Sequence, residues 1–361
     1  MRKFRRHILL WPILISTILS WSIYLSGESF TATIDLDLPT DVLFNVIKIG
    51  PQDSIYALSY LDGRLAVQPK DSGILEIDLK RDAPCGNDCR FFDFSVGEDG
   101  TLYILSLWRS GKQDNHAGVL VYNREGDFKE LIELSRYVDA RRILVDARGR
   151  FIVLGLDPAL YFGKAEALGL IHRYGPDGRY LDTLYALDWR QYVPSGMASL
   201  SIAYNTLRPL VDRLPLVLDA EGNILTAYPG RAGILILEGP ECSSVKQIDL
   251  PLDDIALDLG GRCGGRPFPD PPAVVSLQPA GDHLVVELAL SVACPDSPRP
   301  LTGRARLTVV RSTGAVETVE SVAPQTGTLL ERVALSSDTR LGFLVPQAEG
   351  ARVEIRSVAS P

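Results

Sequence analysis

Apolar and polar residues alternate along much of this chain, in short segments separated by acidic-glycine turns. A unit of strand, turn and strand occurs in register at residues 91–105, 143–154 and 215–227. Alternation with a period of two residues predicts β-strands, and a short turn containing Asp or Glu and Gly predicts a hairpin between them. Further short strands follow each unit. Units of four strands at a spacing of roughly 40 to 50 residues are typical of a β-propeller.

The strand pattern predicts five complete blades and an incomplete sixth, for which the C-terminal segment supplies three strands. The complete blades span residues 44–79, 91–132, 143–184, 215–250 and 274–319. The segment Phe30–Leu36 reads as an isolated strand that resembles the outer strands of other blades. Its pairing with the C-terminal strands would leave the ring without exposed edges. We therefore expect an all-β fold, a six-bladed propeller of four-stranded antiparallel blades closed by an N-terminal strand.

The hairpins of the middle blades resemble those of NHL-type and related six-bladed propellers. The resemblance rests on a Val-Asp-x-x-Gly unit at Val145–Gly149 and a Tyr-x-x-Asp-Gly-x-Tyr-Leu unit at Tyr174–Leu181. It extends over the repeat array as a whole and concerns the fold. It implies no particular activity, because propellers host many unrelated functions.

The first 28 residues read as an export segment that precedes the propeller, residues 29–361. Four basic residues within the first six precede Ile8–Leu25, a stretch of 18 residues without charge. This stretch is long for a cleaved signal peptide and just long enough to cross a bilayer as a helix. A cleaved signal and an uncleaved signal anchor both remain open. We expect a hydrophobic N-terminal helix, a periplasmic or secreted propeller, and contact with a membrane through Ile8–Leu25 if the segment is uncleaved.

Charge and composition narrow the partners. The chain of 361 residues is 46% hydrophobic, has a net charge of −8, and has no long basic run after residue 6. Proteins that bind nucleic acid need a basic surface to meet the phosphates. We therefore exclude nucleic acid and expect a globular domain that binds a protein, peptide or glycan.

The long connections are expected on one face of the ring, here called the long-loop face. They are Lys80–Arg90, Trp108–Gly118, Asp157–Gly169, Leu187–Arg213, Pro251–Ala273 and Ser291–Gly303. Long loops on a rigid scaffold commonly carry binding residues. Aromatic and arginine side chains are favoured anchors, and the candidate ligand-binding residues are Trp108, Arg109, His116, Arg136, Arg142, Trp189, Arg190 and Tyr192. The alternative for Trp189, Tyr192 and Met197 is that they only pin the Leu187–Leu207 insertion, in which we expect a short helix capping the central channel.

Catalytic motifs are missing from the sequence. It has four histidines, and no Gly-x-Ser-x-Gly elbow, phosphate-binding loop or His-Glu-x-x-His pair. Asp139, Asp253, Asp254 and Asp258 would form a cation site only if they converged, and solvated loop carboxylates are the simpler interpretation. We expect no catalytic residues, no metal and no cofactor.

The five cysteines favour disulfides, because thiols oxidise outside the cytoplasm. Cys85 and Cys89 share one connection between blades, and Cys263 and Cys294 lie in neighbouring loops of the long-loop face. We expect the pairs Cys85–Cys89 and Cys263–Cys294, with Cys242 unpaired. A Cys-x₃-Cys metal clip is the alternative for the first pair, although its other ligands are missing.

Three functions remain open. The first is a noncatalytic binding or scaffold propeller that uses its long-loop face. The second is a metal-dependent enzyme resembling six-bladed lactonases or lyases, which requires carboxylates at the starts of several inner strands. Those starts read Phe91, Arg142, Pro215 and Ala273, which argues against it. The third is a sensor domain of a membrane complex.

Overall fold

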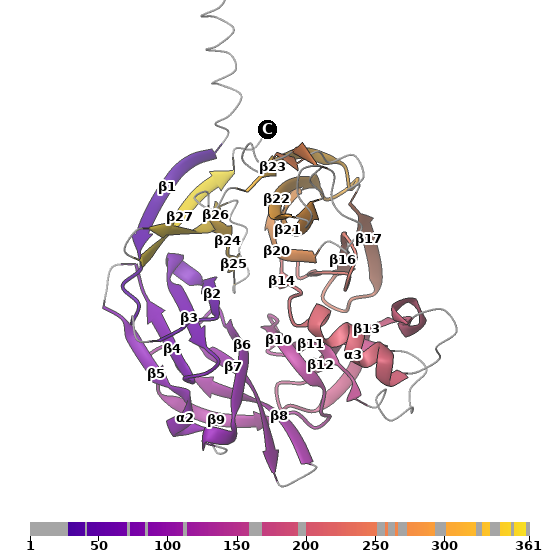
Figure 1. Ribbon diagram of the computed structural model, residues 1–361. Helices are drawn as coiled ribbons and strands as arrows, with labels where there is room; N and C mark the ends of the chain where they lie inside the picture. Colours follow the sequence, from indigo (N-terminus) through magenta and orange to yellow (C-terminus); the bar gives the residue numbers. More distant parts are fainter. Residues whose placement is uncertain are drawn as a thin grey trace, which may run out of the picture.

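Six antiparallel sheets are arranged around a common centre in the computed structural model of the chain (Figure 1). The structure describes residues 28–39, 42–70, 73–83, 86–110, 114–158, 168–193, 200–250, 257–258, 264–265, 273–292, 301–322, 327–332, 340–347 and 350–358. The expected fold class, a six-bladed β-propeller of four-stranded blades, is confirmed.

Each blade runs from an inner to an outer strand in chain order, except that β1 is the outer strand of blade six. Blade one has β2 (Val46–Ile49), β3 (Ile55–Ser59), β4 (Arg64–Gln68) and β5 (Leu75–Asp78), and blade two has β6 (Arg90–Val96), β7 (Leu102–Ser110), β8 (Asp114–Tyr122) and β9 (Phe128–Glu133). Blade three has β10 (Asp139–Val145), β11 (Phe151–Leu156), β12 (Leu168–Tyr174) and β13 (Tyr180–Leu187), and blade four has β14 (Leu216–Leu218), β15 (Ile224–Ala227), β16 (Gly233–Glu238) and β17 (Ser244–Asp249). Blade five has β20 (Ala273–Ala280), β21 (His283–Val292), β22 (Leu301–Val310) and β23 (Val316–Ser321), and blade six has β24 (Thr328–Leu329), β26 (Arg340–Gln347), β27 (Gly350–Val358) and β1 (Glu28–Asp35).

The remaining elements are short and connect or extend the blades. Strand β25 (Glu331–Arg332) follows β24 and pairs in parallel with β2, so that blades one and six meet at the centre. The others are β18 (Leu257–Asp258), β19 (Gly264–Gly265), α2 (Leu79–Asp82), α3 (Leu200–Val211) and the 3₁₀ turns η1 (Pro51–Asp53), η2 (Gly86–Asp88) and η4 (Trp189–Tyr192).

The acidic-glycine turns form because the aspartate side chain organises the backbone of its own turn. In the turn between β10 and β11, one carboxylate oxygen of Asp146 accepts hydrogen bonds from the backbone N–H groups of Arg148 and Arg150, both at 2.9 Å. Gly149 adopts φ of 72°, a conformation that residues with a side chain rarely adopt. Asp219 repeats these bonds in blade four with the N–H groups of Glu221 and Asn223. The repeated sequence unit therefore specifies the hairpin locally.

Apolar side chains fill the spaces between neighbouring blades. One cluster extends through blades three, four and five and includes Leu207 of α3. A second joins blades one and two around Phe91, Phe94 and Tyr122, and a third joins blades two and three. Because the neighbouring blades cover both faces of each sheet near the centre, the inner strands consist mainly of apolar residues.

Strand β1 pairs antiparallel with β27, from Glu28 opposite Val358 to Asp35 opposite Arg352. Ile34 packs there in a cluster with Val353 and Ile355. Residues 1–27, which include the expected hydrophobic helix, lie outside the described residues. In the part of the chain that is described, no helix has the length and apolar character needed to span a membrane.

One of the expected long loops is largely strand, and a second begins and ends in strand. Trp108–Gly118 belongs mainly to the β7–β8 hairpin, in which Ser110 lies opposite Asp114. The Ser291–Gly303 segment likewise begins and ends in β21 and β22, which pair as far as Val292 opposite Leu301. The sequence suggested loops because the strand ends are polar, and polar residues are compatible with strands that extend beyond the core.

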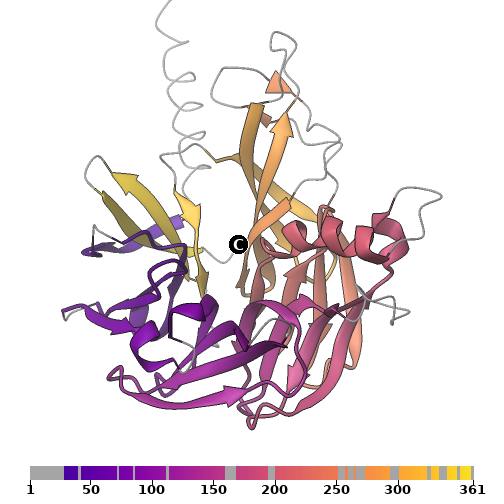
Figure 2. The ribbon, with the colours of Figure 1, turned by 60° about the horizontal axis from the view of Figure 1, so that its bottom comes forward.

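The expected helix of the Leu187–Leu207 insertion is present as α3, and its place differs from the expectation. Ala203, Leu207 and Val211 are buried in the cluster of blades three to five. Figure 1 shows α3 beside β11 and β12 instead of across the centre of the ring. In Figure 2, α3 lies on the same side of the ring as the projecting ends of β21 and β22, the long-loop face.

Candidate binding site at the centre of the ring

Side chains of the inner strands hydrogen-bond to the backbone of the next blade, in its inner strand or just before it. The inner strand is the edge of each sheet, so it presents backbone groups that need partners. Four such bonds join blades one to four: Lys48 Nζ to Phe94 O at 2.9 Å, Ile143 N to Asp93 Oδ2 at 3.0 Å, Val145 N to Ser95 Oγ at 3.2 Å, and Arg142 Nε to Leu214 O at 3.1 Å. These bonds fix the relative position of neighbouring blades.

The same side chains form a buried group of alternating charge, here called the central ion cluster (Lys48, Asp93, Arg142 and Glu331). Lys48 Nζ lies 2.5 Å from Asp93 Oδ1 and 3.7 Å from Glu331 Oε2. An Arg142 nitrogen lies 3.7 Å from Asp93 Oδ1. Burial opposes the charge of Arg142, but the attraction of Glu331 and Asp93 outweighs it and raises the pKa of the guanidinium. The cluster has two positive and two negative groups and therefore no net charge.

A second set of ion pairs connects β10 to α3. The Asp139 carboxylate forms ion pairs with Arg141 at 2.8 Å and with Arg208 at 3.0 Å. It also accepts a hydrogen bond from the Tyr204 hydroxyl at 2.7 Å. Burial, followed by the nearby charge of Asp139, raises the pKa of Tyr204. The carboxylate of Asp139, a candidate cation ligand on sequence grounds, is thus already surrounded by donors. Asp253 and Asp254 lie outside the described residues.

Apolar side chains of the segment before β2, the β3–β4 turn and β6 are here called the inner-rim patch (Leu43, Tyr60, Leu61 and Phe92), in which Phe92 is half-buried and the other three are exposed. Leu43 is 65% exposed, Leu61 72% and Tyr60 38%. The Tyr60 N–H donates to Asn45 Oδ1 at 3.1 Å, which ties the β3–β4 turn to the segment before β2. The ring centres of Tyr60 and Phe92 are 6.3 Å apart.

Arginines border the inner-rim patch. The guanidinium carbon of Arg141 lies 4.7 Å from the centre of the Phe92 ring, on its face. Burial raises the pKa of Tyr60, and the positive charge of Arg142 acts in the opposite direction, which places the Tyr60 hydroxyl near the central ion cluster. Exposed apolar area of the patch therefore adjoins aromatic and guanidinium groups that are held in place by their contacts with one another.

The structure distributes the other predicted site residues over separate places. Trp108 and His116 stack with ring centres 5.4 Å apart on the β7–β8 hairpin, and Arg109 donates to Asn115 Oδ1 at 3.0 Å. Arg136 covers the Tyr180 ring at 4.6 Å and pairs with Asp157. Arg142 alone among them belongs to the central ion cluster.

The three candidates of η4 lie beside blade four. Trp189 is buried in the apolar cluster, with Arg190 over its ring at 5.6 Å. Tyr192 packs against the same cluster, and burial raises the pKa of its hydroxyl. These contacts agree with the alternative that Trp189 and Tyr192 pin the insertion. Met197 lies outside the described residues.

Sequence reasoning missed Lys48, Tyr60, Asp93 and Glu331. It took the inner strands to start at Phe91, Arg142 and Pro215, whereas they start at Arg90, Asp139 and Leu216. Register irregularities between Phe91 and Asp93 and between Ala140 and Arg142 then turn Asp93 and Arg142 toward the neighbouring blade. A charged residue inside an otherwise apolar strand, such as Lys48 or Asp93, was the available signal.

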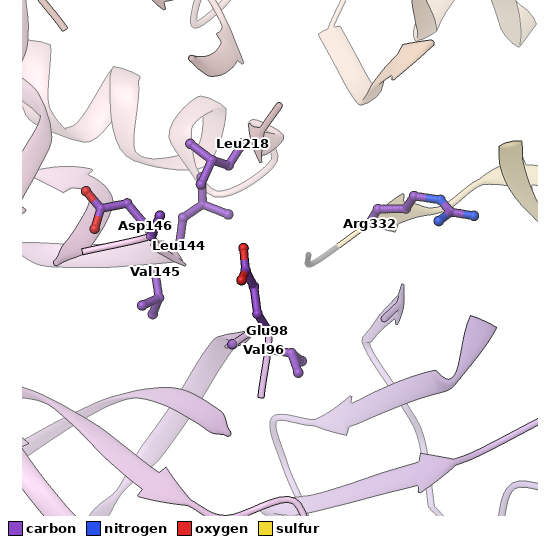
Figure 3. Close-up of a pocket in the computed structure, with 9 residues that line it drawn as sticks. Val96, Glu98, Leu144, Val145, Asp146, Leu218 and Arg332 are labelled. Carbon is purple, nitrogen blue, oxygen red and sulfur yellow. The ribbon is translucent and has the colours of Figure 1, made fainter. Parts of the chain in front are cut away.

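Two cavities lie on the opposite face, where the short turns meet. One of about 40 Å³ lies among the inner turns of blades two to four, and Glu98 points into it across from Arg332 (Figure 3). It has room for little more than a water molecule. A polar groove of about 400 Å³ runs between blades four and five. Its cations are engaged, because Lys246 donates to the Arg311 and Ser312 carbonyls at 2.6 and 2.7 Å and Arg311 pairs with Glu221 at 3.1 Å.

Cys242 is free, as expected, and lies in the turn between β16 and β17. Burial raises the pKa of its thiol. Cys89 is not free. Cys85, Cys263 and Cys294 lie outside the described residues, so the two expected pairings stay predictions. Among the described residues, no three His, Cys, Asp or Glu side chains are grouped as a metal site would require.

The fold defines a class, the six-bladed β-propellers, and a solved structure agrees with it. A member of the DUF4221 family from Bacteroides vulgatus is 6% identical over 91% of this chain and 97% of its own, with a TM-score of 0.50. A PQQ-bound aldose sugar dehydrogenase from Streptomyces coelicolor is 13% identical over 91% and 97%, with a TM-score of 0.46. A virginiamycin B lyase from Staphylococcus aureus is 11% identical over 91% and 99%, with a TM-score of 0.42.

At these identities the likeness concerns the fold alone. No protein-family model matches the chain. No curated protein matches it either. The NHL-like resemblance is therefore a resemblance of fold.

Proposed function

We propose that this chain is an extracytoplasmic binding propeller whose central site is noncatalytic and holds a protein or peptide at the centre of its long-loop face. The observation that carries the proposal is the inner-rim patch, in which two leucines and a tyrosine are exposed beside ordered arginines. Single exposed leucines are common on protein surfaces, whereas a group of apolar and aromatic side chains in one place is typical of a binding site.

The composition of the patch favours a polypeptide ligand over a glycan. Leu43 and Leu61 offer apolar area without hydrogen-bonding groups, which suits apolar side chains of a partner. Tyr60 supplies a residue type that is enriched among the residues that dominate binding energies in protein interfaces. The fixed ion pairs beneath the patch give it a rigid base, so little ordering is needed on binding.

Paired carboxylates support a noncatalytic centre over a metal-dependent, lactonase- or lyase-like one. A cation at the centre would need oxygen ligands that are not already held by other cations. Asp93 and Glu331 contact Lys48, and Asp139 receives two arginines and a tyrosine. A bound divalent ion would have to displace these partners.

Several expectations from the sequence analysis belong to this proposal. Export by residues 1–28 would place the propeller outside the cytoplasm, with Ile8–Leu25 as a membrane anchor if it is uncleaved. Pairing of β1 with β27 would close the ring. Disulfides Cys85–Cys89 and Cys263–Cys294 would stabilise loops of the long-loop face, and Trp108, Arg109, His116, Arg136, Arg190 and the other predicted anchors would extend the contact surface outward.

The test is selection of peptides from a displayed random library on the full chain, followed by titration against variants. We expect selected peptides to be rich in apolar residues and to lose at least tenfold in affinity with Leu61→Glu. Leu181→Glu, which changes a leucine that is 40% exposed on outer strand β13, is the matched control. Equal binding to both variants would refute the site.

A thermal-shift series with calcium and magnesium addresses the competing enzyme. A ligand that binds only the native state raises the apparent stability. A clear stabilisation by either ion that is lost in Asp93→Asn would favour the metal-dependent enzyme over the binding propeller. Capture of oligosaccharides in place of peptides would keep the site and change its ligand class.

A further inference from the structure

A chain of hydrogen bonds crosses the outer three strands of blade two. Ser110 at the end of β7, His116 in β8 and Glu133 at the end of β9 are adjacent on one face of the sheet. Ser110 Oγ lies 2.6 Å from His116 Nε2, and His116 Nδ1 lies 2.6 Å from Glu133 Oε1. Both ring nitrogens of a single histidine are therefore engaged, one by a hydroxyl and one by a carboxylate.

The chemistry of the three groups fixes the direction of the protons. An ionised carboxylate can only accept, so Nδ1 of His116 carries the hydrogen that Glu133 receives. In the neutral ring Nε2 is then the acceptor, and the Ser110 hydroxyl donates to it. This is the arrangement in which an imidazole can remove the proton of an attacking serine while the carboxylate holds its tautomer.

The sheet holds the imidazole in place from one side. Trp108 lies directly opposite His116 in the β7–β8 pairing, and the two rings are stacked within 9° of parallel. Trp108 reaches this position by lying over Gly118, where an added Cβ would come within 2.9 Å of the indole. A glycine in β8 thus permits the stacking that orients the ring.

We propose that Ser110, His116 and Glu133 form a second functional site, a nucleophile, base and orienting acid for acyl transfer from carboxylic esters. It goes beyond the binding function and lies away from the inner-rim patch. In the first step the Ser110 oxygen bonds to the ester carbonyl carbon, its proton passes to His116 Nε2, and the bond to the leaving alkoxide breaks as the alkoxide takes that proton. Water then attacks the acyl-serine with His116 again as base, and releases the carboxylic acid and free Ser110.

Exposure determines which esters are suitable. Ser110 is exposed, the His116 side chain is 29% exposed and that of Glu133 58%, so the site is open to solvent. These three residues do not themselves supply donors for the carbonyl oxygen, a contribution worth about 10²–10³ in rate elsewhere. We therefore expect reaction with activated or small acyl esters.

The experiment treats the full chain with a fluorophosphonate, which phosphonylates activated serines, and maps the adduct by mass spectrometry. We expect the adduct on Ser110, and about 10²-fold slower labelling in His116→Gln because the general base is removed. Glu133→Gln should slow labelling less, since its carboxylate is largely solvated. Ser244, an exposed serine that contacts Glu238 at 2.7 Å without a histidine, is the internal control and should stay unlabelled.

Hydrolysis of p-nitrophenyl acetate distinguishes the triad from a reactive histidine alone. Imidazole hydrolyses such esters without a serine, so the deciding variant is Ser110→Ala, which keeps His116. Loss of at least tenfold in rate in Ser110→Ala, with no change in Ser244→Ala, supports the site. Full activity in Ser110→Ala, or a fluorophosphonate adduct absent from Ser110, would overturn it, and neither result bears on peptide binding at the inner-rim patch.

Discussion

At the scale of the residue, the buried carboxylate of Asp93 connects three blades. It pairs with Lys48 of blade one, accepts the Ile143 N–H of blade three and belongs to a blade of its own between them. The desolvation of such a group is compensated only while its partners remain. The aspartate therefore acts as a structural joint between blades one, two and three.

Asp93→Ala should destabilise the protein by about 3–5 kcal/mol, because it leaves Lys48 buried without its nearest counter-charge. Denaturant unfolding measures the loss. The control is Asp182→Ala. The Asp182 side chain is 44% exposed and pairs with Arg173, so its removal should lower the free energy of unfolding by about 1 kcal/mol or less. Equal costs for the two variants would contradict the joint role of Asp93.

His172 supplies a pH dependence. Its ring is fully buried in blade three, and burial lowers its pKa from 6.5 to about 4. The unfolded chain thus takes up a proton at a higher pH than the folded protein. Stability is complete above pH 6.5 and is lost as the pH falls toward 4, by about 3 kcal/mol at 1.36 kcal/mol per unit.

Unfolding free energies measured between pH 7 and 4 test this dependence. His172→Gln cannot titrate, so its loss of stability over that range should be smaller by about 3 kcal/mol than that of the native chain. His283→Gln retains His172 and should retain the acid-side loss that His172 causes. An unchanged profile in His172→Gln would rule out the buried neutral histidine.

Residue partners of this kind could not be predicted from the sequence. The charges of Lys48 and Asp93 are visible in it, but their pairing depends on the packing of neighbouring blades, and Glu331 joins them only because blade six meets blade one. The polar residues of the β7–β8 hairpin were visible too. Their alignment across three strands required the register.

At the scale of the element, the hairpins were predictable because their information is local. Asp and Gly at fixed positions organise each turn, and alternation assigns the faces of the strands. The lengths of the strands were less so, since a strand can continue beyond the core with polar residues. This is why Trp108 and His116 were expected in a loop and lie in a paired hairpin.

Two turn glycines with nearly the same φ provide a matched comparison. Gly178 and Gly222 have φ of 77° and 80°, so alanine strains both alike. A Cβ on Gly178 would lie 2.2 Å from the Glu133 carbonyl oxygen of the neighbouring blade, whereas a Cβ on Gly222 would meet no atom beyond its own chain neighbours within 4 Å. We expect Gly222→Ala to cost about 1 kcal/mol from backbone strain, and Gly178→Ala clearly more. Equal thermal shifts for the two variants would mean that the backbone of blade two at Glu133 moves to make room for the added Cβ at little energetic cost.

At the scale of the whole molecule, the repeat predicts the ring and its number of blades, while the composition of the sixth blade depends on segments far apart in sequence. The sixth blade combines strands from both ends of the chain, β24, β26 and β27 with β1. Strand Phe30–Leu36 could be proposed for this place because it was left without a partner. The inner joint between β25 and β2 was not visible, since each contributes only a short parallel pair.

Removal of β1 tests closure directly. A chain that begins at residue 38 would expose the edge of β27 and uncover Val353 and Ile355, which pack with Ile34. An unpaired edge strand is a template for association. We expect a lower unfolding midpoint and concentration-dependent aggregation, whereas a chain that begins at residue 28 keeps β1 and should remain monodisperse.

The substitution Ile34→Ala, at a side chain that is 6% exposed, should lower the free energy of unfolding by about 2–5 kcal/mol in the otherwise intact chain. If both shortened chains behave alike and Ile34→Ala is neutral, blade six is stable with three strands and closure depends on the β25–β2 joint instead.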